Sequence, residues 1–125
     1  MVQLRNFGAA PSTKPQREIF EAFLYYIKHE FMYYTYILFS SKLNRYYIGT
    51  TDNPIRRLEE HNSKHYENAF TTKGIPWELI LAYQCQSSGN AYKLEAFIKR
   101  MKSKKFIEKI ISDQSIIVDI ESKLI

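Results

Sequence analysis

Two pairs of residues in the middle of the chain have types and spacings that could serve chemistry. Ten residues that include a turn separate Tyr36 from Tyr47. With a regular hairpin register the two tyrosines face each other across two strands, with both phenols on one side of a sheet. Arg57 and His61 follow at i, i+4 spacing, so both lie on one face of a predicted helix. These residues offer two phenols, a guanidinium and an imidazole to one candidate site.

Two more residues extend this candidate set. Gly49 stands at the end of the second predicted strand, where it lets the backbone approach another group closely. Glu95 lies on a later predicted helix, beside the centre of its apolar face. Each candidate also has a simpler interpretation. The tyrosines could be cross-strand aromatics of a strand-rich segment, and the charged residues could be solvated surface.

Positive charge is concentrated near the C-terminal end. The whole chain of 125 residues has a net charge of +5. The segment from Lys93 to Lys109 holds seven basic residues against two acidic ones. Such a block favours polyanionic partners, although a solvated helix face is the plain alternative.

The elements that must position these residues follow from periodicity and capping signals. Residues 33–40 and 45–51 are predicted strands joined by a turn. Asn53 or Asp52, followed by Pro54, begins a helix that ends near Asn62. Residues 63–76 are a predicted loop, 77–84 a third strand, and Ser87 and Ser103 begin two further helices. The sequence predicts an α+β domain with the order β-β-α-β-α-α, a small three-stranded antiparallel sheet flanked by helices.

The ends of the chain are less regular. Residues 1–31 are predicted to be a loose arm followed by an extra N-terminal helix over 16–30, for which Thr13 could start a capping box. The self-sufficient domain covers residues 32–112. Residues 113–125 are a tail in which a short strand and a helix both fit the pattern.

Composition excludes several classes of protein. The single cysteine, Cys85, rules out an intramolecular disulfide framework and suits a reducing compartment. The longest uncharged runs are shorter than the roughly 20 apolar residues of a membrane helix, and the first residues show no secretory pattern. We expect a cytoplasmic protein without membrane attachment or organic cofactor.

Several motifs in order resemble the GIY-YIG nuclease superfamily, and most closely its small single-domain bacterial members. The first motif is Tyr34-Thr35-Tyr36-Ile37-Leu38, the second is Tyr47-Ile48-Gly49-Thr50-Thr51, and Asn-Pro-Ile-Arg-Arg-Leu-Glu-Glu-His follows over 53–61. Pro-Trp-Glu-Leu at 76–79 and Ala-Tyr-Lys-Leu-Glu-Ala-Phe-Ile-Lys at 91–99 also match. The first motif lacks the Gly and Ile that name the family, and Thr50 stands where some members have Lys.

The resemblance implies a role for each matching residue. It implies that Tyr36, Tyr47, Arg57 and His61 act in catalysis, and that Glu95 both acts in catalysis and binds the metal. It implies a metal-dependent endonuclease in which a tyrosine assists water attack and one Mg²⁺ (or Mn²⁺) assists the leaving oxygen. DNA is a more natural substrate than RNA. We expect the site residues to converge on one face of the sheet.

Nucleic-acid contacts are expected beside this site. Gly49 and the basic residues Lys99, Lys102 and Lys105, with Lys104 between them, would contact phosphates around the cleaved bond. Two alternatives stay open. One is a non-catalytic nucleic-acid-binding module of the same fold, and the other is a protein-interaction domain whose N-terminal helix docks a partner.

Overall fold

The computed structural model describes residues 15–30, 32–63 and 69–124, without the side chains of 26–30 and 69–70. The chain divides into two units, Met1–Phe31 and Met32–Ile125. The first unit holds α2 (Gln16–Glu30), as the periodicity predicts, with Phe20 and Phe23 exposed on it. The capping box proposed at Thr13 lies outside the described residues. No helix among the described residues is long and apolar enough to cross a membrane.

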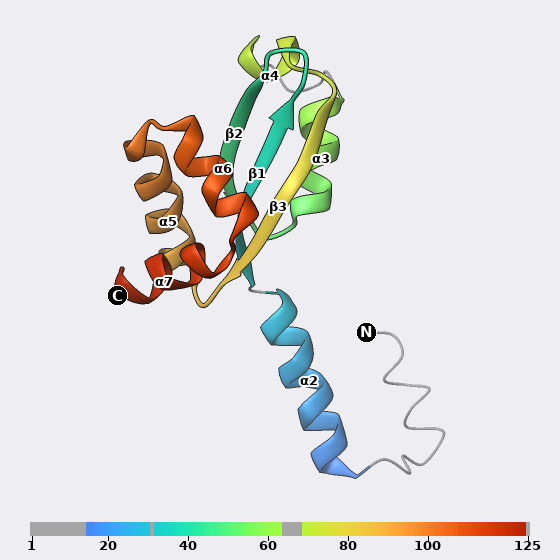
Figure 1. Cartoon of the computed structure of the whole chain (residues 1–125). Helices are drawn as coiled ribbons and strands as arrows, with labels where there is room; N and C mark the ends of the chain where they lie inside the picture. The colour runs from blue at the N-terminus through green and yellow to red at the C-terminus, as the bar shows by residue number, and fades with distance from the viewer. Residues whose placement is uncertain (1–14, 31, 64–68, 125) are drawn as a thin grey trace. The chain divides into compact units, whose positions relative to one another are not determined.

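The second unit is built on a three-stranded antiparallel sheet (Figure 1). Its strands are β1 (Tyr33–Ser40), β2 (Arg45–Thr51) and β3 (Trp77–Cys85). The strand order is β2-β1-β3, so β1 is central and β2 is an edge strand. The predicted fold class, α+β with helices around a small antiparallel sheet, is confirmed.

The hairpin register differs from the predicted one. Tyr36 pairs with Gly49, and Tyr47 pairs with Leu38. The prediction that Tyr36 and Tyr47 lie directly opposite each other was therefore wrong. The turn runs over four residues and ends at Asn44, whose φ of 55° places it in the left-handed region that asparagine tolerates. This turn shifts the pairing by two residues, which preserves the face, so both tyrosine rings pack in one cluster.

Helices cover both faces of the sheet (Figure 1). One face carries α3 (Pro54–Asn62), which begins where the Asn53 side chain accepts from the Arg56 backbone N–H. The other face carries α5 (Ser88–Met101), and α6 (Lys104–Ser112) follows after a break at Lys102. The Ser87 and Ser103 side chains cap α5 and α6 as predicted.

The segment predicted to be a loop between α3 and β3 contains a short helix, α4 (Ala69–Lys73). Trp77 explains it. The indole Nε1 donates to the Thr71 carbonyl at 2.7 Å, and the ring packs so closely on Gly74 that a Cβ there would lie 2.4 Å from it. The polar composition of this segment predicts a loop, because the contact with the buried Trp77 that stabilises α4 comes from outside the segment.

Two hydrophobic clusters, one on each face, hold the helices on the sheet. On the α5 face, Ile37, Ile48, Leu94 and Ile98 form a core with residues of α6 and α7. On the α3 face, a smaller cluster contains Tyr36, Leu38 and Trp77, with Tyr47 and Leu58 packed against it. The side chains of β1 and β2 alternate between these clusters, which fixes the face that each candidate residue serves.

The predicted C-terminal tail contains a helix, α7 (Ser115–Lys123), and it belongs to the core. Ile117 is fully buried, and Glu121 is only 4% exposed. The Glu121 carboxylate accepts from the Tyr83 hydroxyl at 2.7 Å, from the Gln86 backbone N–H at 2.8 Å and from the Asn90 amide at 3.0 Å. These bonds fasten α7 to the end of β3 and the start of α5.

Because Glu121 satisfies three donors, replacing it by glutamine should be costly. In Glu121→Gln an amide group faces at least one donor, and we expect the free energy of unfolding at pH 7 to fall by about 2 kcal/mol. Urea denaturation measures this loss. Asp119→Asn, on the same helix but in an exposed ion pair with Lys123, should cost less than about 1 kcal/mol. Equal stabilities of the two variants would contradict the fastening role of Glu121.

Candidate active site

Tyr36, Gly49 and His61 form the buried part of the site. The Tyr36 side chain is 1% exposed, and its hydroxyl lies 3.2 Å from His61 Nε2. Tyr36 lies across Gly49, its partner on β2, so closely that a Cβ at position 49 would stand 2.5 Å from the tyrosine oxygen. Only glycine leaves room for this ring.

His61 comes from the last turn of α3 and is completely buried. Its pKa is lowered to about 4, mainly by burial and also by the positive charge of Arg57, while Glu60 opposes the change. The imidazole is therefore neutral at pH 7. Tyr47 packs its ring edge-on against this imidazole, with 4.6 Å between ring centroids.

The low pKa of His61 makes folding sensitive to mild acid. Below pH 6.5 an unfolded chain protonates this imidazole, whereas the folded chain keeps it neutral down to about pH 4. We expect the free energy of unfolding to fall by about 2 kcal/mol between pH 7 and pH 5, and His61→Gln to remove most of this dependence. Urea denaturation at several pH values tests it. An NMR titration that protonates His61 near pH 6.5 would contradict it.

Arg57 and Glu60 lie one turn apart on the same helix. Arg57 Nη1 contacts Glu60 Oε1 at 2.7 Å, and the arginine side chain is 24% exposed. The neighbouring Arg56 pairs with Asp52 at 2.7 Å and is 52% exposed. Arg57 is thus the more enclosed of the two arginines, and its charge acts on the buried imidazole.

Glu95 reaches the site from the opposite face of the sheet. Its Oε1 accepts from the Thr50 hydroxyl at 2.6 Å, and its Oε2 accepts from Lys99 Nζ at 2.6 Å. The Lys99 ammonium in turn lies 6.0 Å from the centroid of the Tyr47 ring. Thr50 also donates to the Ala91 carbonyl, which fixes β2 against α5.

These contacts correct the prediction that the candidate residues converge on one face of the sheet. Tyr36 lies over Gly49 on the α3 face, and Glu95 bonds to the next residue, Thr50, on the α5 face. Because β2 is an edge strand, the two groups flank the same two residues of an open border. Lys99 pairs with Glu95 on one side of this border and lies 6.0 Å from the centroid of the Tyr47 ring on the other.

The carboxylate of Glu95 fits a divalent cation that takes most of its ligands from water and from the substrate's phosphate. Within the described residues, no group of three or more His, Cys, Asp and Glu side chains could hold a metal ion. Mg²⁺ commonly binds through one or two carboxylates and completes its shell with water and phosphate oxygens. Glu95 already binds one cation, the Lys99 ammonium, on Oε2, so its charge and partial exposure suit such an ion.

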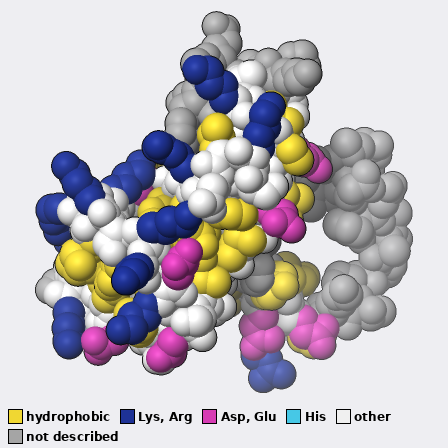
Figure 2. Space-filling model, turned by 45° about the horizontal axis from the view of Figure 1, so that its top comes forward, with side chains coloured by type: hydrophobic (Ala, Val, Ile, Leu, Met, Phe, Trp, Pro, Cys, Tyr) yellow, Lys and Arg dark blue, Asp and Glu magenta, His cyan; other side chains and the backbone are white. Residues whose placement is uncertain are grey.

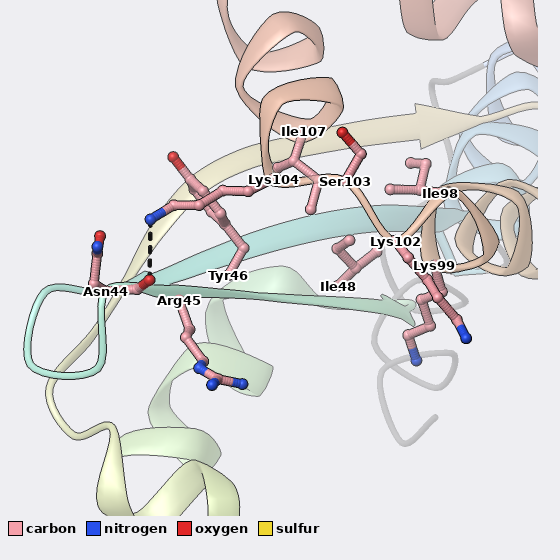
Figure 3. Close-up of a pocket in the computed structure, with 10 residues that line it drawn as sticks. All are labelled: Asn44, Arg45, Tyr46, Ile48, Ile98, Lys99, Lys102, Ser103, Lys104 and Ile107. Carbon is pink, nitrogen blue, oxygen red and sulfur yellow. Dashed lines mark hydrogen bonds between the residues drawn. The ribbon is translucent and has the colours of Figure 1, made fainter.

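A groove runs between β2 and the α5–α6 junction (Figure 3). Lys99, which lines it, bonds to Glu95. The groove has a volume of about 410 Å³. Two of the predicted nucleic-acid contacts, Lys99 and Lys102, line it, together with Lys104. Lys105 instead lines a separate depression on α6, beside Phe106. In Figure 2, Lys and Arg side chains, with some Asp and Glu side chains among them, border a band of hydrophobic side chains on the face shown.

Two features of the site were not predicted. Thr50 was noted only for the absence of a lysine, but it holds Glu95 in place. Arg45 begins β2 at the far end of the groove. No local sequence pattern marks either residue, because both acquire their neighbours through the packing of α5 and α6 on the edge strand.

The fold and site together define a small α+β domain with a Tyr–His pair, an arginine and a carboxylate around one strand border. A family model described as the GIY-YIG catalytic domain matches residues 32–124. The chain therefore belongs to the GIY-YIG family, and its assignment to the GIY-YIG-type endonucleases is confirmed at that level.

Several curated proteins are similar over part of the domain. Structure-specific endonuclease subunit SLX1 homolog 1 of Trypanosoma cruzi is 54% identical over 37 residues, which cover 28% of this chain and 7% of that protein. Structure-specific endonuclease subunit slx1 of Xenopus laevis is 40% identical over 60 residues, or 44% of this chain and 21% of that protein. SLX1 of Meyerozyma guilliermondii is 42% identical over 59 residues, with 44% and 20% covered.

The matched segments are thus a small part of these relatives: 7% of the length of the Trypanosoma cruzi protein and 21% of that of the Xenopus laevis protein. No solved structure matches the chain significantly.

Proposed function

We propose that the chain is a metal-dependent endonuclease that hydrolyses phosphodiester bonds in nucleic acid, DNA rather than RNA. One observation carries the proposal. The Tyr36 hydroxyl and the Glu95 carboxylate flank consecutive residues, Gly49 and Thr50, of the edge strand β2. A phosphate at this border would meet a proton-transfer group on one side and a metal-binding carboxylate on the other.

We assign the base to Tyr36, because its hydroxyl contacts the His61 imidazole. A phenol with a pKa near 10 is a poor base at pH 7, by about 4 kcal/mol, unless its proton has an acceptor or a cation is near. The neutral His61 imidazole stands 3.2 Å from the Tyr36 hydroxyl and can take that proton as Tyr36 accepts one from water. Tyr47, packed against His61, orients the attacking water.

The charged residues stabilise the phosphate. Arg57 offers a planar fork for the non-bridging oxygens as negative charge builds up. Glu95 would hold Mg²⁺ or Mn²⁺, with Thr50 fixing the other carboxylate oxygen. When bound, the ion supplies Lewis acidity toward the phosphate and the leaving oxygen. Lys99, which pairs with Glu95, would then contact a neighbouring phosphate instead.

Conservative tyrosine variants test this proposal. We expect Tyr36→Phe to lower the single-turnover cleavage rate by about 10²-fold to 10⁴-fold, because it removes the proton-transfer group and leaves the ring in place. Tyr34→Phe, two residues earlier on the same strand, should cleave at the parent's rate. If Tyr36→Phe also cleaves at that rate while folding normally, Tyr36 is not the base.

A parent protein that binds nucleic acid tightly but cleaves none of it would favour the alternative, a binding module of the same fold. The basic groove beside β2 is the observation that supports this alternative.

A further inference from the structure

The groove between β2 and the α5–α6 junction differs in character from the site at the strand border. Its long side is β2, with Asn44 and Arg45 at one end and Lys99 and Lys102 near the other (Figure 3). We propose that this groove binds an unpaired segment of the substrate strand next to the cleaved bond. The proposal rests on the proposed function, since it places the bound strand relative to Glu95.

Charge is the first argument. Lys99, Lys102 and Lys104 line the groove, and no Asp or Glu is among the described residues that line it. Lys104 Nζ donates to the Asn44 carbonyl at 3.2 Å, so its ammonium is held across the groove toward the β1–β2 turn (Figure 3). Ammonium groups fixed along one path suit successive phosphates of a single strand.

The lining between these charges is the second argument. The half-buried side chains of Tyr46 and Ile107 line the groove, next to Ile48 and Ile98 of the buried core. The Tyr46 ring is held in place by Phe39, with 4.9 Å between ring centroids. Apolar and aromatic side chains make no favourable contact with a charged sugar–phosphate backbone, but they stack well against the face of an exposed base. Bases in a duplex are stacked and paired, so only an unpaired nucleotide can stack against these side chains.

Size and position agree with this interpretation. A volume of about 410 Å³ lies in the range of sites for small molecules, which suits one or two nucleotides. Lys99 lines the groove and also bonds to Glu95 at 2.6 Å. A strand that leaves the groove past Lys99 therefore arrives at the carboxylate. The substrate class is nucleic acid with an unpaired stretch beside the cleaved bond.

Binding without cleavage provides the test. The affinities of a fluorescent single-stranded oligonucleotide and of a blunt duplex of the same sequence are measured in EDTA at several salt concentrations, with DNA and with RNA. We expect Lys104→Ala to weaken single-strand binding about 5-fold to 10-fold and to reduce the salt slope by about 0.7. Duplex affinity should change less than about twofold. Lys109→Ala, an exposed lysine further along α6, should bind both probes like the parent.

A substitution at Lys102 distinguishes the loss of a binding contact from the loss of the fold. It has a φ of 50°, in the left-handed region that favours glycine. Lys102→Gly should therefore raise Tm, by about 4 °C, while it weakens single-strand binding. A protein that is more stable but binds less well has lost a contact and not its fold.

The outcomes separate this proposal from the proposed function. If Lys104→Ala and Lys102→Gly bind the single strand like the parent, or lose duplex binding to the same extent, the groove proposal is wrong even if the parent cleaves. If the parent cleaves nothing but the groove variants lose single-strand binding selectively, the groove proposal stands and the nuclease proposal fails.

Discussion

Glu95→Gln is expected to reduce the cleavage rate by about 10³-fold at saturating Mg²⁺. Glutamine has nearly the same shape, and its amide oxygen can still accept from the Thr50 hydroxyl, which donates to Glu95 at 2.6 Å. The variant loses the negative charge that would hold a divalent ion. Single-turnover kinetics on a labelled substrate measure the loss.

The fold and the binding surface should survive this change. The ion pair between Glu95 and Lys99 involves a lysine that is 52% exposed, so its loss should cost less than about 1 kcal/mol of stability. Binding in EDTA should stay equal to the parent's or become tighter, because a carboxylate near the phosphate path is gone. Glu78→Gln, at an exposed position on β3, is the control. A Glu95→Gln protein with the parent's Mg²⁺-dependent rate would remove Glu95 from the mechanism.

The second large effect is expected from Gly49→Ala. The added Cβ would lie 2.5 Å from the Tyr36 hydroxyl oxygen and 2.6 Å from the ring carbon that bears it, so the buried ring must move. Overpacking of this kind typically costs about 1–3 kcal/mol of stability. The displacement also breaks the 3.2 Å contact between Tyr36 and His61, and we expect cleavage to fall by at least about 10²-fold.

Gly89→Ala is the matched control for this variant. Gly89 lies in the first turn of α5, and a Cβ there would come no closer than 3.8 Å to the Ser87 hydroxyl. Alanine is the better helix former, so this variant should be as stable as the parent or slightly more stable, with full activity. If Gly49→Ala behaves like Gly89→Ala, the close packing of Tyr36 on the second strand has no role in catalysis.

Local patterns predicted much of the fold. The strands of the hairpin, the Asn53 cap with Pro54, and the Ser87 and Ser103 caps depend on neighbouring residues, and the structure has them where expected. The predicted strand bounds imply the observed pairing of Ser40 with Arg45, and the register was missed because Tyr36 and Tyr47 were placed opposite each other without regard to the four-residue turn that ends at Asn44. The short helix α4 was missed because Trp77, a residue outside it, holds it in place.

The candidate site was predictable as a set of residues, but its arrangement was not. The i, i+4 spacing of Arg57 and His61 follows from helix geometry alone. The way Glu95 approaches from the other face depends on how α5 packs on the edge strand, through Thr50 and Ala91. The complete burial of His61, and with it the low pKa, likewise depends on Tyr36 and Tyr47 covering the end of α3.

The central claim is that this strand border hydrolyses phosphodiester bonds with the help of a divalent ion. The most direct test is to incubate the purified chain with a labelled panel of single-stranded, duplex and partly unpaired DNA and RNA, with Mg²⁺ and with EDTA. We predict internal cleavage of at least one DNA substrate with Mg²⁺, and none with EDTA or with Glu95→Gln. Cleavage that continues in EDTA, or tight binding of the panel with no cleavage at any Mg²⁺ concentration, would contradict the claim.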